Sequence, residues 1–268
     1  MKRARTELTG TVGFVPTMGF LHEGHLALVR RAKRKNDVAV VSIFVNPTQF
    51  GPGEDLAEYP RHTGRDLALL KKEGVDIVFM PTPNGMYPDG YSTWVETSGI
   101  TEILEGKKRP GHFRGVTTIV NKLFNIVLPH KAYFGQKDGQ QLRVIQKMVT
   151  DLNMHIKIIS VPTVRSKRGL AMSSRNMHLS DEEREAALVL YKALSIAKDL
   201  YMRGEYDATR IKAKMTGLIK REPLAKIDYI SIADSDSLQE LTCINRPALV
   251  SMAIKIGSTR LLDNRIIG

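Results

Sequence analysis

The feature that most constrains the fold is an alternation of short apolar runs with amphipathic segments over the first part of the chain. Val38–Val45 (VAVVSIFV) is continuous and apolar, as strands covered on both faces of a sheet are. Strand–helix–strand repetition of this kind is typical of a doubly wound parallel sheet. We therefore expect an α/β, Rossmann-like domain over residues 1–163. Its other strands are expected at Thr11–Val15, Val75–Met80, Ala132–Phe134 and Ile156–Val161, and its helices before Asn36 and at Arg65–Lys72, Gly115–Val127 and Gln140–Leu152.

The pattern changes after residue 163. Asp181–Arg203, with Ser180 as its cap, predicts one long helix, and Asp207–Lys220 predicts a second. Three runs typical of strands follow, at Ile227–Ala233, Ala248–Ile256 and Arg260–Leu262. A helix pair with a small antiparallel sheet indicates a smaller C-terminal α+β domain at residues 164–268.

The composition excludes several classes of protein. A hydrophobic content of 42% with 25% charged residues is ordinary for a globular chain. The longest apolar runs are too short to cross a bilayer, and we expect no signal peptide and no membrane partner. The single cysteine, Cys243, permits no internal disulfide and fits a reducing compartment, so we expect a cytoplasmic protein.

The net charge of +12 raises the question of a nucleic-acid partner. The excess of Lys and Arg is spread over both halves of the chain. Its densest cluster, within Arg30–Lys35, lies at the end of a predicted helix, where cations complement the helix dipole. A basic RNA-binding module would need clustered charge and exposed aromatic residues, yet aromatic residues make up 6%. We keep that module as an alternative and expect no nucleic acid.

A candidate phosphate site follows the first predicted strand, at Pro16–His25 (PTMGFLHEGH). Ligands of open α/β sheets bind at the carboxyl ends of strands, and a helix that begins there offers free N–H groups to phosphate. His22 and His25 lie three residues apart, so they share one face of a first helical turn. Their imidazoles can donate hydrogen bonds to a triphosphate and to its charged transition state. A packing or surface role for both histidines is the alternative.

His-x-Gly-His at this position resembles the nucleotidylyltransferase superfamily, whose members act at a nucleotide α-phosphate and expel pyrophosphate. Further blocks narrow the resemblance to the pantothenate synthetase family, from about Gly13 to Asn264. These blocks are Val15–His25, Ile43–Phe50 (IFVNPTQF), Tyr59–Arg61 (YPR), Arg109–Gly115 (RPGHFRG), Phe134–Gln141 (FGQKDGQQ) and Leu170–Asn176 (LAMSSRN). Another nucleotidylyltransferase, the alternative enzyme, would not need IFVNPTQF or FGQKDGQQ.

The resemblance implies a function and a set of residue roles. It implies an ATP-dependent ligase that joins pantoate to β-alanine through a pantoyl-adenylate, uses Mg²⁺ and forms a homodimer. The implied ATP-binding residues are Met18, Gly19, Phe20, Leu21, His22, Glu23, Gly24, His25, Gly135, Gln136, Lys137, Asp138, Val164, Met172, Ser173, Ser174 and Arg175. Met18, Asn46, Gln49 and Gln141 would bind pantoate or β-alanine, and His22, His25, Lys137 and Arg175 would be catalytic, with His25 as proton donor. No metal ligand can be named.

These residue types suit the implied chemistry. Lys137 is a compact cation that can neutralise the charge on expelled pyrophosphate. Neutral amides such as Gln49 and Gln141 both donate and accept, which suits a ligand with hydroxyls and a carboxylate. Ser173–Arg175 offers hydroxyls and a guanidinium as a phosphate clamp, in a loop that we expect to close as part of a lid.

The chain departs from the family pattern in three places. The segment before Val12 is shorter than is usual, which leaves open whether an N-terminal helix is present. Gln136 stands where Glu is common, and Ser166 and Arg168 stand where acidic residues are common. These changes flank the implied ligands and replace none of them.

Overall fold

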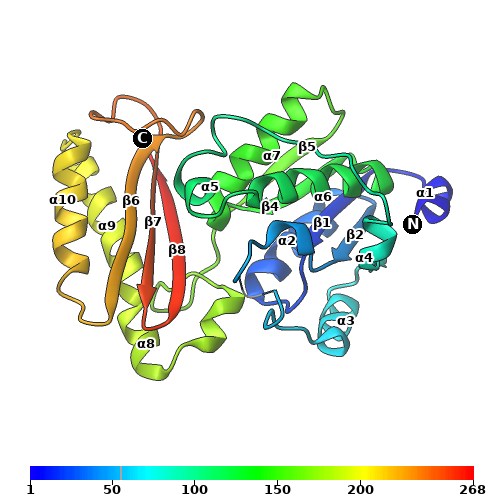
Figure 1. The fold of residues 1–268 in the computed structure, drawn as a ribbon, viewed down its shortest axis with the longest axis horizontal. Helices are drawn as coiled ribbons and strands as arrows, with labels where there is room; N and C mark the ends of the chain where they lie inside the picture. The colour runs from blue at the N-terminus through cyan, green and yellow to red at the C-terminus, as the bar shows by residue number, and fades with distance from the viewer. Residues whose placement is uncertain (55) are drawn as a thin grey trace. The chain divides into compact units, whose positions relative to one another are not determined.

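The computed structural model describes residues 1–54 and 56–268. The chain forms two compact units, each with its own sheet (Figure 1). Met1–Gly135 and Gln141–Pro162 make the first, and Gln136–Gln140 with Thr163–Gly268 make the second. The predicted fold class is confirmed, because the first sheet is parallel and the second is small and antiparallel.

The first unit is built on a five-stranded parallel sheet with the order β3-β2-β1-β4-β5. Its strands are β1 (Val12–Thr17), β2 (Val38–Ile43), β3 (Ile77–Phe79), β4 (Lys131–Gly135) and β5 (Lys157–Val161). The chain adds strands on one side of β1 and then crosses to its other side with β4, so strand order reverses at β1. In such sheets this reversal opens a ligand crevice at the carboxyl ends of the strands.

Helices cover both faces of this sheet. Neighbouring residues of β1 point to opposite faces and therefore pack against different helices. Val15 packs with residues of α2 (Glu23–Lys35), such as Leu28 and Val29. Phe14 meets Phe124 of α6 (His112–Val127), with ring centroids 6.4 Å apart. The remaining helices are α3 (Thr63–Lys72), α7 (Gly139–Asp151) and the short α1 (Lys2–Glu7), α4 (Pro83–Met86) and α5 (Leu104–Lys108). A short N-terminal helix is therefore present, although none of its residues is buried.

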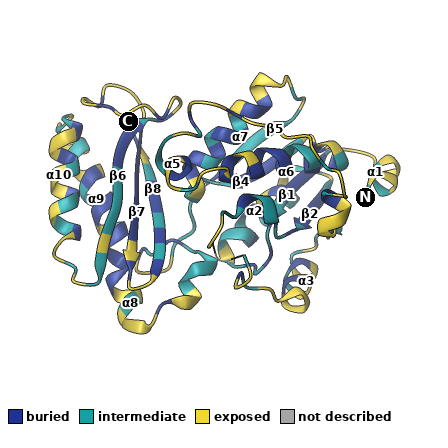
Figure 2. Cartoon of the chain, in the orientation of Figure 1, coloured by how far each residue is buried: buried dark blue, intermediate teal, exposed yellow. Residues whose placement is uncertain are grey.

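The second unit packs α9 (Leu188–Met202) and α10 (Ala208–Ile219) on a sheet of the order β6-β7-β8. The strands are β6 (Ala225–Asp234), β7 (Ala248–Ile256) and β8 (Thr259–Ile267). Fully buried side chains of β7, such as Met252 and Ile254, share one core with Leu194 and Ile211 of the helices. Buried residues accordingly follow the strands and the helix faces turned toward them (Figure 2).

Two element predictions for the second unit were wrong. The single helix expected at Asp181–Arg203 is divided into α8 (Asp181–Ala186) and α9, with the break at Ala187. The Ala187 carbonyl accepts from the N–H of Leu190, three residues on, which is a tighter turn than an α-helix has. β8 continues well past the predicted Arg260–Leu262, because it pairs with β7 as far as Ile267. Two polar residues of this continuation, Asp263 and Asn264, are buried and hydrogen-bonded.

No helix in residues 1–54 and 56–268 is long and apolar enough to span a membrane.

Candidate active site

A tight turn joins the end of β1 to the start of α2. Gly19 has φ 82° and Phe20 has φ 48°, both in the left-handed region. A Cβ atom on Gly19 would lie 3.1 Å from Ile43 Cγ2 and 3.2 Å from Asp66 Oδ2. Glycine at position 19 therefore serves both the backbone angle and the available space.

The turn is held by the first residues of α3. The Asp66 carboxylate is 1% exposed and accepts from the N–H of Phe20 at 2.7 Å and the N–H of Leu21 at 2.8 Å. Arg65 donates to the Leu21 carbonyl at 3.0 Å and lies over the Phe20 ring. Successive N–H groups in this conformation form an anion-binding nest, and here the protein's own carboxylate occupies it.

His22 and His25 cap the start of α2. His22 is the N-cap residue, and its Nδ1 accepts from the N–H of Gly24 at 3.1 Å. His25 Nδ1 accepts in turn from the N–H of His22 at 3.4 Å, and the two rings stack with centroids 4.1 Å apart. An Nδ1 that accepts carries no proton, so each neutral ring has its N–H at Nε2. The cap therefore sets both imidazoles as donors through Nε2, beside the partial positive charge of a helix N-terminus.

Asn46 and Gln49 form a buried amide pair after β2, around the 3₁₀ turn η1 (Pro47–Gln49). Asn46 Nδ2 donates to Gln49 Oε1 at 3.2 Å and to the Gly115 carbonyl at 3.1 Å. Gln49 Nε2 contacts Met18 Sδ at 2.9 Å. These contacts fix the orientation of the Gln49 amide and bring together Asn46, Gln49 and Met18, three of the four residues for which the family resemblance implies a shared ligand.

Close packing and a tyrosine complete the support of this pair. A Cβ atom on Gly115 of α6 would lie 2.3 Å from the Thr48 carbonyl oxygen, so only glycine permits this approach. The Tyr87 hydroxyl donates to Asn46 Oδ1 at 2.9 Å, and burial raises the pKa of Tyr87, which keeps it a donor. Asn46 is therefore bonded at both ends of its amide.

A charged network lies against the backbone of Gln49. Arg109 binds Glu54 through two hydrogen bonds of 2.7 and 2.5 Å, and its Nη1 lies 3.1 Å from His112 Nε2. His112 Nδ1 is 2.8 Å from the Gln49 carbonyl. Since a carbonyl only accepts, Nδ1 carries the proton and Nε2 accepts from the guanidinium.

Electrostatics agree with that assignment. Burial, together with the charge of Arg109, lowers the pKa of His112 to about 4. Burial raises the pKa of Glu54, but the hydrogen bonds and charge of Arg109 outweigh it and hold that pKa below its ordinary value. His112 is therefore neutral near pH 7 and ties Arg109 to the backbone of Gln49. Sequence interpretation had placed neither residue in such a network.

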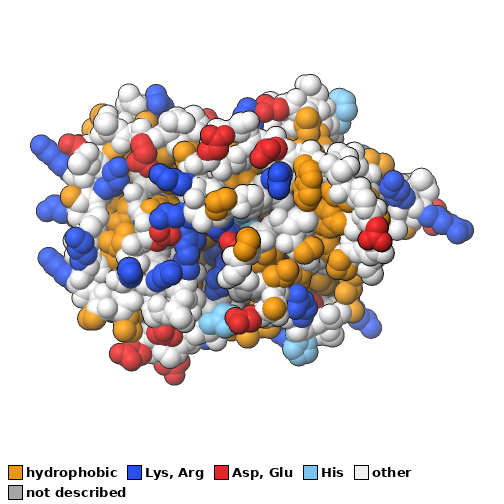
Figure 3. Space-filling view, in the orientation of Figure 1, with side chains coloured by type: hydrophobic (Ala, Val, Ile, Leu, Met, Phe, Trp, Pro, Cys, Tyr) orange, Lys and Arg blue, Asp and Glu red, His pale blue; other side chains and the backbone are white. Residues whose placement is uncertain are grey.

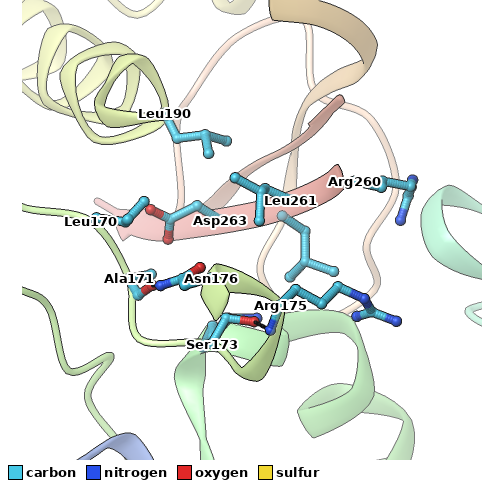
Figure 4. A pocket seen from close by; sticks show the side chains of 11 residues that line it. Leu170, Ala171, Ser173, Arg175, Asn176, Leu190, Arg260, Leu261 and Asp263 are labelled. Carbon is cyan, nitrogen blue, oxygen red and sulfur yellow. Dashed lines mark hydrogen bonds between the residues drawn. The ribbon is translucent and has the colours of Figure 1, made fainter. Parts of the chain in front are cut away.

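The second unit contains a small pocket. Figure 4 shows Ser173 and Arg175 along one side of it and Arg260 of β8 on another. Lys137, from the 3₁₀ turn η2 (Gln136–Asp138), also lines it. On the face drawn in Figure 3, Lys and Arg side chains are numerous over this unit. Its lining includes three cations and a hydroxyl beside the carboxylate of Asp263, which is paired with Arg165. Arg260 is paired with Asp228, so Lys137, Arg175 and Ser173 are the groups that suit an anionic ligand.

The other predicted site residues are divided between the two units. The N–H of Met172 donates to the Val164 carbonyl at 2.9 Å, and Ser174 opens the turn η3 (Ser174–His178) next to Ser173. Lys137 Nζ lies 3.3 Å from Asp138 Oδ1. Gly135 ends β4, and Gln141 is half-buried in the first turn of α7, both in the first unit. Of the residues that depart from the family pattern, Arg168 pairs with exposed Glu185 at the surface.

Sequence interpretation did not single out Asp66, Asp263 or Asn264. Each is a polar residue buried to 4% exposure or less within an otherwise regular element. The one available signal was the position of Asp66 on the face of α3 that also buries Leu70, four residues on.

Comparison with known proteins identifies the family of the chain. The family model described as pantoate-beta-alanine ligase matches residues 1–266. A pantothenate synthetase of Acetivibrio thermocellus is 56% identical over 99% of this chain and 94% of its own. The crystal structure of pantothenate synthetase from Thermus thermophilus has 45% identity and a TM-score of 0.95, covering 98% of this chain and 96% of that one.

A third relative carries ligands. It is a pantoate-beta-alanine ligase from Francisella tularensis, described as complexed with beta-gamma ATP and beta-alanine. Its identity to this chain is 38% and its TM-score 0.80, over 99% of this chain and 94% of that one. On this identity and coverage, the chain belongs to the pantoate-beta-alanine ligase family.

Proposed function

We propose that the chain condenses pantoate with β-alanine, consuming ATP and releasing AMP and diphosphate through a pantoyl-adenylate. The observation that carries this proposal is the paired-histidine cap at the start of α2, which fixes two Nε2–H donors beside a helix N-terminus. This arrangement suits a nucleotide phosphate, and it occurs in a chain that matches the ligase family over residues 1–266.

In the first step, a carboxylate oxygen of pantoate attacks the α-phosphorus of ATP, and the bond to pyrophosphate breaks. His22 and His25 would donate through Nε2 to phosphate oxygens whose negative charge grows in the transition state. Lys137 and Arg175 would neutralise the departing pyrophosphate, with the Ser173 and Ser174 hydroxyls as further donors. No side chain forms a covalent intermediate in this scheme.

In the second step, the amine of β-alanine attacks the acyl carbon, the bond to AMP breaks, and the amine loses a proton. Gln49 would hold first pantoate and then β-alanine, and Gln141 would hold pantoate. The support is the fixed orientation of the Gln49 amide by Asn46 and Met18. An amide held in place lowers the cost of orienting the reactants.

We further propose that Mg²⁺ enters bound to the ATP phosphates. Among the residues that the structure describes, no group of three His, Cys, Asp or Glu side chains could hold a metal. Mg²⁺ commonly keeps several waters and binds through substrate phosphates with one or two carboxylates, so it needs no such cage. Asp138, whose Oδ1 lies 3.3 Å from Lys137 Nζ, is a carboxylate that could contribute. Bound there, Mg²⁺ would offset phosphate charge.

We also propose an oligomeric state and a location for the protein. We expect a homodimer, which light scattering tests, and no nucleic-acid partner, which a binding titration with RNA tests. The proposal of a cytoplasmic location rests on the single cysteine, Cys243, which permits no internal disulfide.

The deciding experiment measures AMP release from ATP with Mg²⁺, pantoate and β-alanine, each omitted in turn. Omitting pantoate should abolish AMP release. Omitting β-alanine should abolish it too, because the AMP stays covalently bound in pantoyl-adenylate and only about one equivalent of pyrophosphate is released per enzyme. The same assay on His25→Ala serves as the control for contaminating ATPases. AMP release that is independent of pantoate would contradict the proposal.

A further inference from the structure

Two neighbouring polar residues of β8, Asp263 and Asn264, are buried at 2% and 4% exposure. Successive side chains of a strand point to opposite faces, so the two can serve different segments. Buried polar groups are costly unless they are bonded, which makes their partners informative. Both have partners in the segments that carry the proposed phosphate ligands of this unit.

Asn264 holds the segment that carries Lys137. Its Nδ2 donates to the Lys137 carbonyl at 2.6 Å, and its Oδ1 lies 3.5 Å from Gln136 Nε2. A Cβ atom on Gly139 would lie 3.2 Å from both ends of the Asn264 amide. Asn264 is therefore fitted closely against the segment, and its hydrogen bond fixes the backbone from which the Lys137 side chain enters the pocket.

Asp263 holds the hairpin that leads into Ser173. Its carboxylate makes two hydrogen bonds to Arg165, of 2.5 and 2.9 Å, and Arg165 also donates to the Gly169 carbonyl at 3.1 Å. Backbone bonds, such as that from the N–H of Ser166 to the Leu170 carbonyl, close the hairpin. Because this ion pair is largely buried, removing one partner would leave an uncompensated charge.

We propose that Asn264 and Asp263 are positioning residues for the nucleotide phosphates, Asn264 acting through Lys137 and Asp263 acting through Arg165 on Ser173 and Arg175. The inference rests on the proposed function of the pocket. One strand thereby sets the spacing between two phosphate-binding segments that lie far apart in the sequence. Asn264 itself supplies no charge to the ligand.

The test separates the two half-reactions. Asn264→Ala should slow adenylate formation from ATP and pantoate about 10- to 100-fold, the effect of a displaced catalytic group. Attack of β-alanine on supplied pantoyl-adenylate should change by less than about threefold, because pyrophosphate has already left. Isosteric Asn264→Asp should lose as much as Asn264→Ala, since it presents an acceptor to the Lys137 carbonyl.

A double-mutant cycle distinguishes positioning from general destabilisation. Lys137→Ala should also cripple adenylate formation and spare amine attack. In that background, Asn264→Ala should cost less than about threefold more, because the group it positions is gone. Full additivity of the two losses, or equal losses in both half-reactions, would overturn the inference.

Further variants control for folding defects and test the role of Asp263. Asp234→Asn, which removes a carboxylate bonded to Ser237 at the end of β6, is the control and should stay within about twofold of the parent. Gly139→Ala, which crowds the Asn264 amide, should reproduce the half-reaction split if Asn264→Ala does not fold. Asp263→Asn should raise the KM for ATP about tenfold and leave the KM for pantoate nearly unchanged. An unchanged KM for ATP would refute the role of Asp263.

Failure of the proposed function would look different. The parent enzyme itself would then form no pantoyl-adenylate, whatever residue stood at position 264. A parent that forms adenylate, with Asn264→Ala and Gly139→Ala as fast as the parent, would leave the function standing and remove the inference alone.

Discussion

Lowering the pH should destabilise the first unit through His112. The folded protein holds the pKa of this ring near 4 because it is buried and its Nε2 accepts from Arg109, whereas an unfolded chain has its ordinary value of 6.5. Stability from neutral His112 is therefore fully present above pH 6.5 and is lost as the pH falls toward 4. Between pH 7 and pH 5 the unfolded chain takes up most of a proton here and the folded chain very little. At 1.36 kcal/mol per pKa unit, the loss is about 2 kcal/mol.

The assay is urea unfolding at the two pH values, followed by the fluorescence of Trp94, the single tryptophan, which lies in the first unit. Glu54 also has a lowered pKa, so protonation of Glu54 destabilises the folded protein as the pH falls. The contribution of His112 must therefore be separated from that of Glu54. His112→Leu should remove about 2 kcal/mol of the pH-dependent loss. Phe113→Leu, a neighbouring core substitution without a titrating group, should keep it. A loss as large in His112→Leu as in the parent would refute the lowered pKa of His112 as its source.

Three further predictions concern the nucleotide. His25→Ala should lower kcat about 10²- to 10³-fold in the AMP-release assay, with a smaller change in the KM for ATP, because a donor to the transition state is lost; near-normal turnover would make His25 a packing residue. Asp66→Asn should cost about 2–4 kcal/mol in urea unfolding and raise the KM for ATP, since an amide offers one acceptor to two backbone N–H groups. Glu73→Gln, at the other end of α3, should lower stability and leave that KM unchanged. ATP should increase hydrogen-exchange protection of residues 166–176, and Arg175→Ala should abolish the increase; equal exchange with and without ATP would rule out a lid.

Local patterns in the sequence predicted most of the fold because each depends on neighbouring residues. The continuous apolar run at Val38–Val45 and the capping signal at Ser180 could be interpreted without knowing what packs on them, and the structure bears both out. The break at Ala187 could not, because alanine is a strong helix former and a tertiary environment decides where such a helix turns. The predicted strand at Arg260–Leu262 ended too early because the polar residues Asp263 and Asn264 follow it. Their hydrogen-bond partners lie elsewhere in the chain, so the sequence did not show that the strand continues through them.

In the candidate site, too, residues of a local motif were predictable and residues with distant partners were not. His22 and His25 stand in a short motif, so their shared helix start was predictable, although their mutual capping through Nδ1 was not. Asp66 accepts hydrogen bonds from Phe20 and Leu21, which lie 46 and 45 positions earlier in the sequence. Asn264 donates to Lys137, which lies 127 positions earlier. A single sequence contains no signal for pairings over such separations, because they are set by how the elements pack.

The discontinuity of the second unit constrains how such enzymes can be recombined. The chain leaves the first unit after Gly135, contributes Lys137 to the second, and returns at Gln141. A chimera that exchanges everything after Pro162 would therefore combine the lysine segment of one parent with the β8 strand of another. Its success would depend on whether the incoming residue at position 264 fits against Gly139, and crossover libraries should show a covarying choice at these two positions. The contact that decides whether a hybrid functions thus lies inside the second unit, between positions 139 and 264. It does not lie at Pro162, where the chain last passes from the first unit into the second.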